Sequence, residues 1–388
     1  MMRIILAGII GRYPWGGVTW CSLMYLLGLR KLGHDVYYIE DTCECNYDPE
    51  INAIAVDPKY ALNYIHQSLS PFGFGDRWCY IDYKGGHHGM TREACEEICE
   101  SADLFLVLSG GCWIWRDHYL EIPVKVFIDS DPAFTQRALE QARQADAQQE
   151  KKQWYVDFFR TYDRLFTMGG NIGFDECDTP VAGFDWFHIL QPVDTEIWTP
   201  NQSALPSREE WTTVMSWSIH SFKDIGGYKD QEFLKVLDLS RRCAERGGPA
   251  LELAINGPME LLREHGWRCV DANGVSSDLW RYHGYLSTSR GEFGVAKHTY
   301  VESQCGWFSD RTECYMAAGR PAVVQDTNFA TRIPAGEGLF AWKTADDAIE
   351  ALLAVEADYD RHSRAARELA MEYFDSRRVL CALLDRCS

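Results

Sequence analysis

The sequence predicts an α/β protein made of two successive, doubly wound, Rossmann-like units. Short apolar runs alternate with helix-length segments along both halves of the chain, and this alternation is typical of parallel sheets covered on both faces. A stretch with three prolines and little apolar periodicity, QPVDTEIWTPNQSALPSREE (residues 191–210), separates the halves. We therefore expect a joint between two units there.

The first half is predicted to alternate strands with helices. Apolar runs that end in small or acidic residues indicate buried strands, and apolar residues at helical spacing before Gly33 indicate a helix over residues 18–32. The predicted strands are residues 3–10, 34–41, 103–111, 124–132 and 164–170. The polar stretch QARQADAQQEKKQ (residues 141–153) is interpreted as a solvated helix or a flexible excursion.

The same alternation restarts after the joint. The predicted strands are residues 212–218, 250–257 and 292–297, with helices over residues 230–246 and 259–266. In SDRTECYMAAGRPAVVQDT (residues 309–327), Asp310 and Glu313 form a capping-box pattern at a helix start. Gly319 and Pro321 then end that helix before a buried strand, and the tail over residues 347–387 is predicted to be mostly helical.

Composition limits the class of protein. The 388 residues are 46% hydrophobic and 24% charged, which allows a sizeable core, and the formal net charge of −19 argues against a protein that binds nucleic acid mainly through phosphates. No apolar stretch approaches the roughly 20 residues of a membrane span, and no secretory signal is evident. A soluble protein of the reducing cytoplasm is therefore expected.

The 14 cysteines are scattered and form no CxxC pair. Cys95 and Cys99 lie one helical turn apart, with His87 and His88 nearby. Inward packing of the two thiols is the preferred interpretation and a metal site is the alternative, so no metal site is predicted.

Ligands of open parallel sheets bind beyond the carboxyl ends of the strands. Gly16 and Gly17 follow the first strand and precede a helix, where they let an anion approach backbone N–H groups or simply form a tight turn. Glu40 and Asp41 follow the second strand, as a ribose-binding acid does in a dehydrogenase, but the G-x-G-x-x-G spacing is missing.

Candidate catalytic groups follow two later strands. Asp129 and Asp131 end the fourth predicted strand, where they either cap the next helix or bind sugar hydroxyls and act as a base. His118 lies on the same predicted rim. Each of these residues also has an ordinary structural interpretation, since a single histidine is more often a packing residue than a base.

The helix start at residues 310–313 is the predicted anion site. A cation at Arg311 opposes the helix dipole unless an anion binds there, so we expect a diphosphate at Asp310, Arg311 and Thr312. Arg290 and Lys297 flank the preceding strand and are expected to add positive charge at the same rim.

The stretch DRTECYMAAGRPAVVQDT, followed by IPAGEGLFAWKTADDAIEALLAV, resembles the nucleotide-binding half of GT-B glycosyltransferases of the group 1 type. Members carry a glutamate-led helix, E-A-x-A-x-G-x-P-V-V, then a glycine loop and a helix. The residues that fall on this pattern are Glu313, Ala317, Gly319, Pro321, Val323 and Val324, with Gly336 and Gly338 on the later loop. The opening GGVTWCSLMYLLGLRKLGHDVYYIE resembles the start of the same family.

The resemblance implies the GT-B architecture, in which two Rossmann-like domains face a cleft and a C-terminal helix crosses back. The implied domains are an acceptor domain (1–200), a donor domain (201–370) and a returning helix (371–388). It also implies that Glu313 binds the donor ribose and that Gly16 and Gly17 face the donor phosphates. After the first strand of the second domain, it implies basic groups for the diphosphate, for which His220 and Lys223 are the candidates.

One position departs from the family. Retaining members often carry a glutamate eight residues before the ribose-binding one, and this sequence has Cys305 there, with Glu302 and Asp310 as the nearest carboxylates. The stereochemical outcome is therefore not assigned. The resemblance implies a metal-independent transferase that moves a sugar from a nucleoside-diphosphate sugar to a hydroxyl-bearing acceptor.

Four other functions stay open. A sugar-nucleotide epimerase needs the donor pocket but no acceptor site, and a dehydrogenase needs nicotinamide binding. A non-catalytic sugar- or nucleotide-binding module binds donors without turning them over. A DNA-modifying glycosyltransferase gives a salt-sensitive DNA complex.

Overall fold

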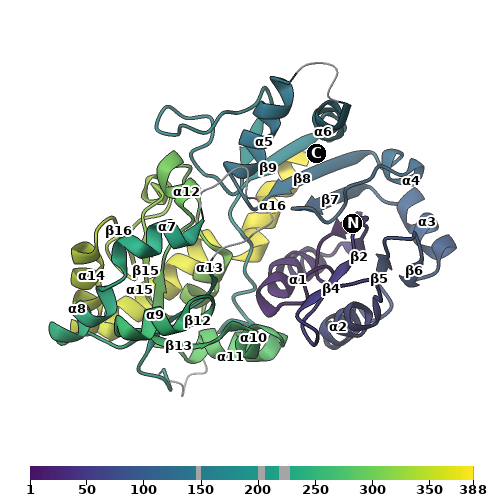
Figure 1. Cartoon of the computed structure of the whole chain (residues 1–388). Coiled ribbons are helices and arrows are strands. Elements are labelled where there is room, and N and C mark those ends of the chain that lie inside the picture. The colour runs from purple at the N-terminus through teal and green to yellow at the C-terminus, as the bar shows by residue number, and fades with distance from the viewer. Residues whose placement is uncertain (146–149, 200–205, 218–227, 388) are drawn as a thin grey trace.

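The computed structural model describes residues 1–145, 150–199, 206–217 and 228–387, which form two α/β units (Figure 1). Each unit has a mainly parallel sheet, as the sequence predicts. Alternate residues of the first strand enter different core clusters, with Ile4 and Leu6 in one and Ile5 and Ala7 in the other. This sheet is therefore buried on both faces, which explains why its strands are apolar throughout.

The sheet of the first unit has the order β10-β9-β8-β7-β1-β2-β5-β6 in the described chain, and β6 alone is antiparallel to its neighbour. Its strands are β1 (Arg3–Ala7), β2 (Asp35–Glu40), β5 (Trp78–Ile81), β6 (His87–Gly89), β7 (Leu104–Leu108), β8 (Val124–Asp129), β9 (Arg164–Thr167) and β10 (Trp186–His188). A separate hairpin consists of β3 (Asn46–Asp48) and β4 (Ala53–Ala55). The helices are α1 (Gly16–Lys31), α2 (Lys59–Leu69), α3 (Arg92–Glu100), α4 (Asp117–Leu120), α5 (Phe134–Arg143) and α6 (Glu150–Arg160), with the 3-10 turn η1 (Ser70–Phe72).

The sheet of the second unit is parallel, in the order β13-β12-β11-β14-β15-β16. Its strands are β11 (Trp211–Ser216), β12 (Leu251–Asn256), β13 (Arg268–Asp271), β14 (Gly291–Gly294), β15 (Ala322–Gln325) and β16 (Leu339–Trp342). Its helices are α7 (Lys229–Phe233), α8 (Leu239–Glu245), α9 (Met259–Glu264), α10 (Ala272–Ser276), α11 (Leu279–Thr288), α12 (His298–Ser303), α13 (Asp310–Ala317), α14 (Ala345–Ala357) and α15 (Tyr359–Tyr373), with 3-10 turns η3 (Leu234–Val236) and η4 (Phe329–Thr331).

The strand order reverses at one point in each sheet, between β1 and β7 in the first and between β11 and β14 in the second. Chain connections leave such a point in opposite directions, which opens a crevice at the carboxyl ends of the strands. The fold therefore offers two crevices for ligands, one in each unit.

The contact between α1 and α11 joins the two units. An ideal Cβ on Gly16 would lie 2.6 Å from Cβ of Tyr282 and 3.1 Å from the carbonyl oxygen of Asp278. Next to this contact, the indole N–H of Trp20 donates a buried hydrogen bond of 2.9 Å to the carbonyl oxygen of Leu279. A residue without a side chain is thus required at position 16 for the two helices to approach this closely.

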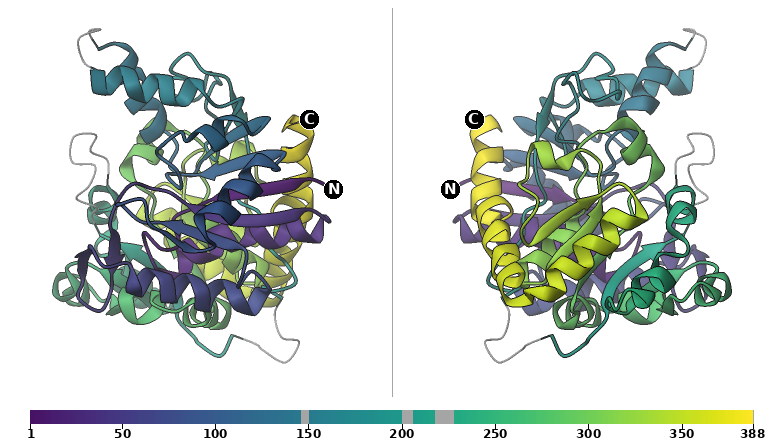
Figure 2. Two further views of the ribbon diagram at one scale, coloured as in Figure 1. Left: turned by 90° about the vertical axis from the view of Figure 1, so that its right-hand side faces the viewer. Right: turned by 90° about the vertical axis from the view of Figure 1, so that its left-hand side faces the viewer.

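The final helix, α16 (Ser376–Cys387), returns to the first unit, as the predicted architecture requires. An ideal Cβ on Gly28 of α1 would lie 2.4 Å from Cδ1 of Leu380, so α16 packs directly on α1. Paired backbone hydrogen bonds fix its approach, from Val193 N–H to the Phe374 carbonyl and from Ser376 N–H to the Val193 carbonyl. The two chain termini lie on the same side of the molecule (Figure 2). No described helix is long and apolar enough to span a bilayer.

Several strands have no counterpart in the sequence prediction. They are β3, β4, β5, β6, β10, β13 and β16, of three or four residues each. Such segments are too short to show a periodicity, and β13 has only partly buried and exposed residues at the edge of its sheet. The predicted capping box is also absent, because Ser309 is the N-cap of α13 and makes no side-chain capping hydrogen bond.

We expect Gly16→Ala to destabilise the protein by about 1–3 kcal/mol, because the added methyl group overlaps Tyr282. The matched control is Gly284→Ala on α11, where an added Cβ meets no heavy atom within 4 Å. That change should stabilise the helix by about 0.5–1 kcal/mol. Denaturant unfolding midpoints of the two variants check this, and equal midpoints would contradict the described helix contact.

Candidate functional site

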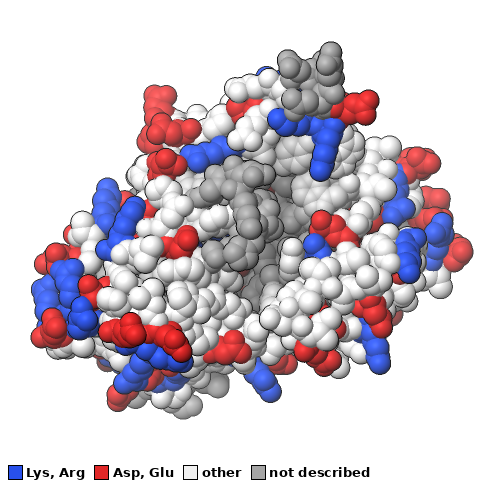
Figure 3. Space-filling view, in the orientation of Figure 1, with Lys and Arg blue, Asp and Glu red and all other residues white. Residues whose placement is uncertain are grey.

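A cavity of about 320 Å³ lies at the carboxyl end of the second sheet. Its walls come from the ends of β11 and β12, from α10 and from the start of α13, and Trp15 and Gly17 of the first unit close it from the other side. Figure 3 shows a hollow between the two units, with acidic and basic side chains interspersed on both sides of it. The cavity is thus an interdomain site at the crevice that the strand order creates.

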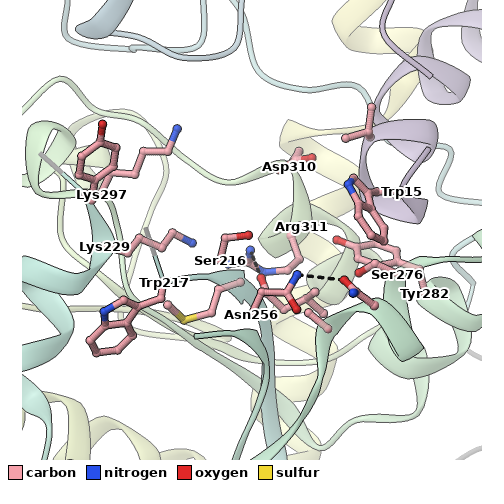
Figure 4. Close-up of a pocket in the computed structure, with 17 residues that line it drawn as sticks. Trp15, Ser216, Trp217, Lys229, Asn256, Ser276, Tyr282, Lys297, Asp310 and Arg311 are labelled. Carbon is pink, nitrogen blue, oxygen red and sulfur yellow. Dashed lines mark hydrogen bonds between the residues drawn. The ribbon is translucent and has the colours of Figure 1, made fainter. Parts of the chain in front are cut away.

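Among the described residues, three cationic side chains line this cavity: Lys229, Lys297 and Arg311 (Figure 4). Lys229 is the first residue of α7, and its ammonium group has no hydrogen bond or ion pair within the described part of the chain. Burial, followed by the charges of Arg311 and Lys297, lowers its pKa to about 7. An unpaired lysine between two other cations is stabilised by an anionic ligand.

Arg311 has an internal counter-ion. Its Nε donates to Glu292 on β14 at 2.7 Å, and its Nη1 donates to the carbonyl oxygen of Val214 at 2.8 Å. The carboxylate of Glu292 is fully buried. The conflict of Arg311 with the helix dipole is therefore resolved within the chain, so the sequence argument that this arginine requires a bound anion was wrong, although the side chain does line the cavity.

The opposite end of the cavity carries neutral polar groups. The side-chain amides of Asn256 and Asn273 form a hydrogen bond of 3.0 Å, and Ser276 lies beside them (Figure 4). The indole ring of Trp15 lines the same cavity. The cavity thus has a cationic end for an anion and a neutral, aromatic end for a planar polar group.

A second cavity, of about 270 Å³, adjoins the first on the side of the first sheet. The two cavities share Val18, Lys297 and Asp310 as lining residues. Apolar side chains form much of its wall, and Ser109, Ser130 and Asp131 at the carboxyl ends of β7 and β8 supply polar groups. Two binding spaces therefore meet at Asp310 and Lys297.

The carboxylate of Asp131 is held by two residues of the second unit. Lys297 pairs with its carboxylate, and the hydroxyl group of Tyr300 donates to the same oxygen at 2.5 Å. Burial alone would raise the pKa of Asp131, but the charge and hydrogen bond of Lys297, with the hydroxyl group of Tyr300, hold it below its usual value. Asp131 is therefore an ionised carboxylate at the boundary between the cavities.

Asp129 has a structural role, because its carboxylate is used in hydrogen bonds within the first unit. Its carboxylate is buried and accepts hydrogen bonds from Thr135 Oγ1 at 2.7 Å, Gln136 Nε2 at 2.8 Å and Thr167 Oγ1 at 2.9 Å. Burial raises its pKa to about 6 in spite of these donors. It lines neither cavity, and it fixes the β8–α5 turn that presents Asp131.

Two other predicted residues lie away from both cavities. His118 belongs to α4, which packs against α3 beside the antiparallel edge of the first sheet. Arg290 precedes β14, at the amino end of the strand, where it pairs with Glu356 at 2.7 Å and lies over the ring of Tyr359. The predicted places of His118 and Arg290 at the catalytic rim were therefore wrong.

Glu313 is also outside the first cavity. It is 1% exposed on the face of α13 that points toward α1, and neither of its carboxylate oxygens has a hydrogen-bond partner. Burial, followed by the charge of Asp310, raises its pKa well above the usual range, and only the nearby backbone of Gln191 opposes the shift. Glu313 is not among the lining residues of the cavity, whereas Asp310 and Arg311 of the same helix are.

Of the remaining predicted residues, some line the first cavity and others do not. Gly17 lines the first cavity, whereas Gly16 lies in the contact with Tyr282. Thr312 is buried and lines a side pocket of about 20 Å³ behind the helix start. His220 and Lys223 lie outside the described residues. Lys229, which sequence reasoning missed, is the next lysine after them, and its position directly before a predicted helix was the available signal.

The acidic residues at the end of β2, Glu40 and Asp41, are bound by other groups of the protein. Glu40 accepts hydrogen bonds from the backbone N–H groups of Gly11 and Arg12, and burial raises its pKa to about 7. Asp41 pairs with Arg116 at 2.6 Å. Neither carboxylate is available for a ribose, which weakens the dehydrogenase interpretation.

No protein-family profile matches the sequence, and no curated protein matches it. Solved structures do match over the whole chain. An alpha-glucosyltransferase in complex with UDP-glucose and DNA containing an abasic site has a TM-score of 0.59 at 12% identity, over 100% of this chain and 99% of that chain. A sucrose-phosphate synthase from Thermosynechococcus elongatus has 0.55 at 12%, over 100% and 98%. AviGT4, a glycosyltransferase involved in avilamycin A biosynthesis, has 0.52 at 14%, over 100% and 97%.

We expect Glu313→Gln to leave nucleotide binding unchanged and to stabilise the protein near neutral pH, because it removes a buried carboxylate without partners. The folded state holds the Glu313 proton more tightly than the unfolded state, so wild-type stability should fall as pH rises above about 4.5, and the variant should lose this decrease.

Unfolding free energies between pH 4 and pH 8 check this. Asp310→Asn, at the cavity-facing position of the same helix, is the comparison for binding. A loss of nucleotide affinity in Glu313→Gln, with Asp310→Asn unaffected, would contradict the described orientation of α13.

Proposed function

We propose that this chain, which has the GT-B glycosyltransferase fold predicted from its sequence, transfers a sugar from a nucleoside-diphosphate sugar to a hydroxyl-bearing acceptor. The observation that carries the proposal is the pair of adjoining cavities, one in each unit, that meet at Lys297 and Asp310. Two ligands placed there share a boundary at which a group can pass between them. The proposed division is an acceptor domain over residues 1–200, a donor domain over 201–370 and a returning helix over 371–388.

The diphosphate of the donor would lie at the cationic end of the first cavity. Lys229 and Lys297 offer ammonium groups there, and the uncapped start of α13 offers backbone N–H groups. These groups stabilise the negative charge that develops on the leaving diphosphate. The proposed diphosphate site consists of residues of this chain alone, and the proposed transfer requires no metal ion.

The nucleoside would occupy the neutral end. The amides of Asn256 and Asn273 offer donors and acceptors for the edge of a base, and Ser276 offers a hydroxyl group for the ribose or the base. Trp15 offers a ring face from the other unit. With Glu313 turned away, we assign the nucleoside to these groups instead.

Asp310 would face the transferred sugar. It lines both cavities, has no ion pair within the described part of the chain, and supplies the one carboxylate among the described lining residues of the donor cavity. Glu302, the other carboxylate near the family position occupied by Cys305, is exposed and pairs with Arg137. Asp310 therefore takes the place of the sugar-facing carboxylate.

The acceptor would bind in the second cavity with its hydroxyl group near Asp131. In the structure Lys297 and Tyr300 hold that carboxylate. A diphosphate competes for Lys297, so donor binding would free Asp131 to accept the acceptor proton. This coupling makes the base available only when the donor is present.

The second cavity also bears on the alternative functions. An epimerase needs no acceptor space, so a separate cavity of about 270 Å³ beside the donor favours transfer. Its apolar wall favours a small acceptor with an apolar body. A DNA acceptor is the second candidate, because one of the similar structures contains DNA. A DNA complex that weakens with salt would favour it.

We expect Lys229→Met to weaken the binding of nucleoside diphosphates roughly 10- to 100-fold at pH 6.5, because a charge-assisted hydrogen bond to phosphate is lost. A thermal-shift screen of nucleoside diphosphates identifies the ligand, and calorimetry measures its affinity. Lys235→Met is the control, since Lys235 lies on η3 and pairs with Glu232 outside the cavity.

Binding should also take up protons. The diphosphate favours the charged form of Lys229, whose pKa is lowered to about 7 in the free protein. Wild-type affinity for a nucleoside-diphosphate sugar should therefore decrease as pH rises above about 7, with proton uptake that Lys229→Met abolishes. Equal affinity and equal proton uptake in wild type and variant would show that Lys229 does not bind the diphosphate.

We expect Asp131→Asn to keep or strengthen nucleotide binding, because Lys297 loses a competing carboxylate, and to lower kcat by about 100-fold or more, because a general base is lost. Steady-state kinetics with the donor found in the screen check this. The control is Glu302→Gln, an exposed carboxylate on the neighbouring helix α12. A strong loss of nucleotide affinity without a change in kcat would assign Asp131 to donor binding instead.

A further inference from the structure

A cluster of thiol and imidazole groups lies at the edge of the first sheet, away from both cavities. Sγ of Cys79 on β5, a ring nitrogen of His87 on β6 and Sγ of Cys95 on α3 all lie within 4.8 Å of one another. Both cysteines are 0% exposed. In Figure 1 these elements lie together on the outer side of the first unit. The residues come from three elements, so the fold and not the local sequence brings them together.

The imidazole of His87 is oriented for a ligand. Its Nδ1 lies 3.1 Å from the carbonyl oxygen of Gly85, to which it can donate, and its Nε2 is buried without any hydrogen-bond partner. Metal-binding histidines are typically held in this way, with one nitrogen donating to a carbonyl group so that the other presents its lone pair. His88, the next residue on β6, faces Asp82 at 2.8 Å and is not part of the cluster.

A third thiol completes the group. Cys99 follows Cys95 by one turn of α3, is 1% exposed, and interacts with the thiol of Cys95. The thiols of Cys79 and Cys99 both lie at hydrogen-bonding distance from that of Cys95. Sulfur atoms gathered in this way can share one soft cation.

We propose that Cys79, His87, Cys95 and Cys99 bind one Zn²⁺ ion in a tetrahedral, structural site. Three sulfurs and one imidazole form a common structural zinc set, and soft thiolate ligands favour zinc over Mg²⁺ or Ca²⁺. With Zn–S bonds of about 2.3 Å, ligand atoms lie about 3.8 Å apart. Cys79, His87 and Cys95, whose ligand atoms lie within 4.8 Å of one another, therefore need only small side-chain adjustments, whereas Cys99 has to turn its thiol toward the ion. Metal binding releases the remaining thiol protons to solvent, and no redox step is involved.

The ion would stabilise the edge strand β6 of the first sheet. The strand β6 has three residues and is the antiparallel edge strand beside β5. The four ligands join both strands of this hairpin to α3, so zinc adds a link that the short strand lacks. The site is separate from the proposed donor and acceptor cavities, and it is compatible with a transfer reaction that uses no metal.

The test measures metal in the full-length protein, purified under reducing conditions and reconstituted with ZnSO₄. We expect one zinc per chain by elemental analysis, and Co²⁺ substitution should give thiolate charge-transfer absorption with the d–d bands of a tetrahedral site. Cys95→Ser should lose the stoichiometric zinc, whereas Cys243→Ser, a buried cysteine of α8 in the second unit, should keep it.

The fourth ligand has its own test. Cys99→Ser should alter the cobalt spectrum and weaken zinc binding at least tenfold in a chelator competition, whereas His118→Gln should change neither. The proposal is overturned if the reconstituted wild type holds no zinc, if Cys95→Ser retains one equivalent, or if thiol titration finds a disulfide between Cys79 and Cys95. An effect of His118→Gln in place of Cys99→Ser would overturn the assigned ligand set.

Discussion

The close contact of α1 with α11 is the constraint on which the rest of the structure depends. Gly16 lets the two helices approach to backbone distance, and the indole of Trp20 bonds to the carbonyl oxygen of Leu279 inside the contact. Helix α1 follows β1 of the first sheet, and α11 precedes β14 of the second sheet. Their contact therefore makes the carboxyl ends of the two sheets face each other. A single bulky residue at position 16 would separate the cavities that now adjoin.

Two of the three described cations of the cavity are already paired within the chain. Arg311 is neutralised by Glu292 and Lys297 by Asp131, which leaves Lys229 as the cavity cation without a partner among the described residues. An unpaired ammonium group between two cations is costly to desolvate, and its lowered pKa reflects that cost. An anionic ligand removes this cost, so the charges of the cleft suit the proposed diphosphate.

The sequence predicted the fold well and the site only in part. Strand and helix alternation, Gly319 at the end of α13 and the returning C-terminal helix are local or family patterns, and the structure confirms them. The direction of a side chain depends on about 100° of rotation per helical residue, which the sequence does not fix against a neighbour. Glu313 therefore lies buried outside the cavity, although the sequence pattern placed it at the ligand. Cys79 and Cys95 come together only because α3 packs beside β5.

The central claim is that a nucleoside diphosphate sugar lies between the two units and takes Lys297 from Asp131. A crystal structure of the complex measures this directly. The account predicts the diphosphate within hydrogen-bonding distance of the Nζ atoms of Lys229 and Lys297, with the ion pair between Lys297 and Asp131 broken. A bound donor elsewhere, or a donor in this cavity with that ion pair intact, would contradict it.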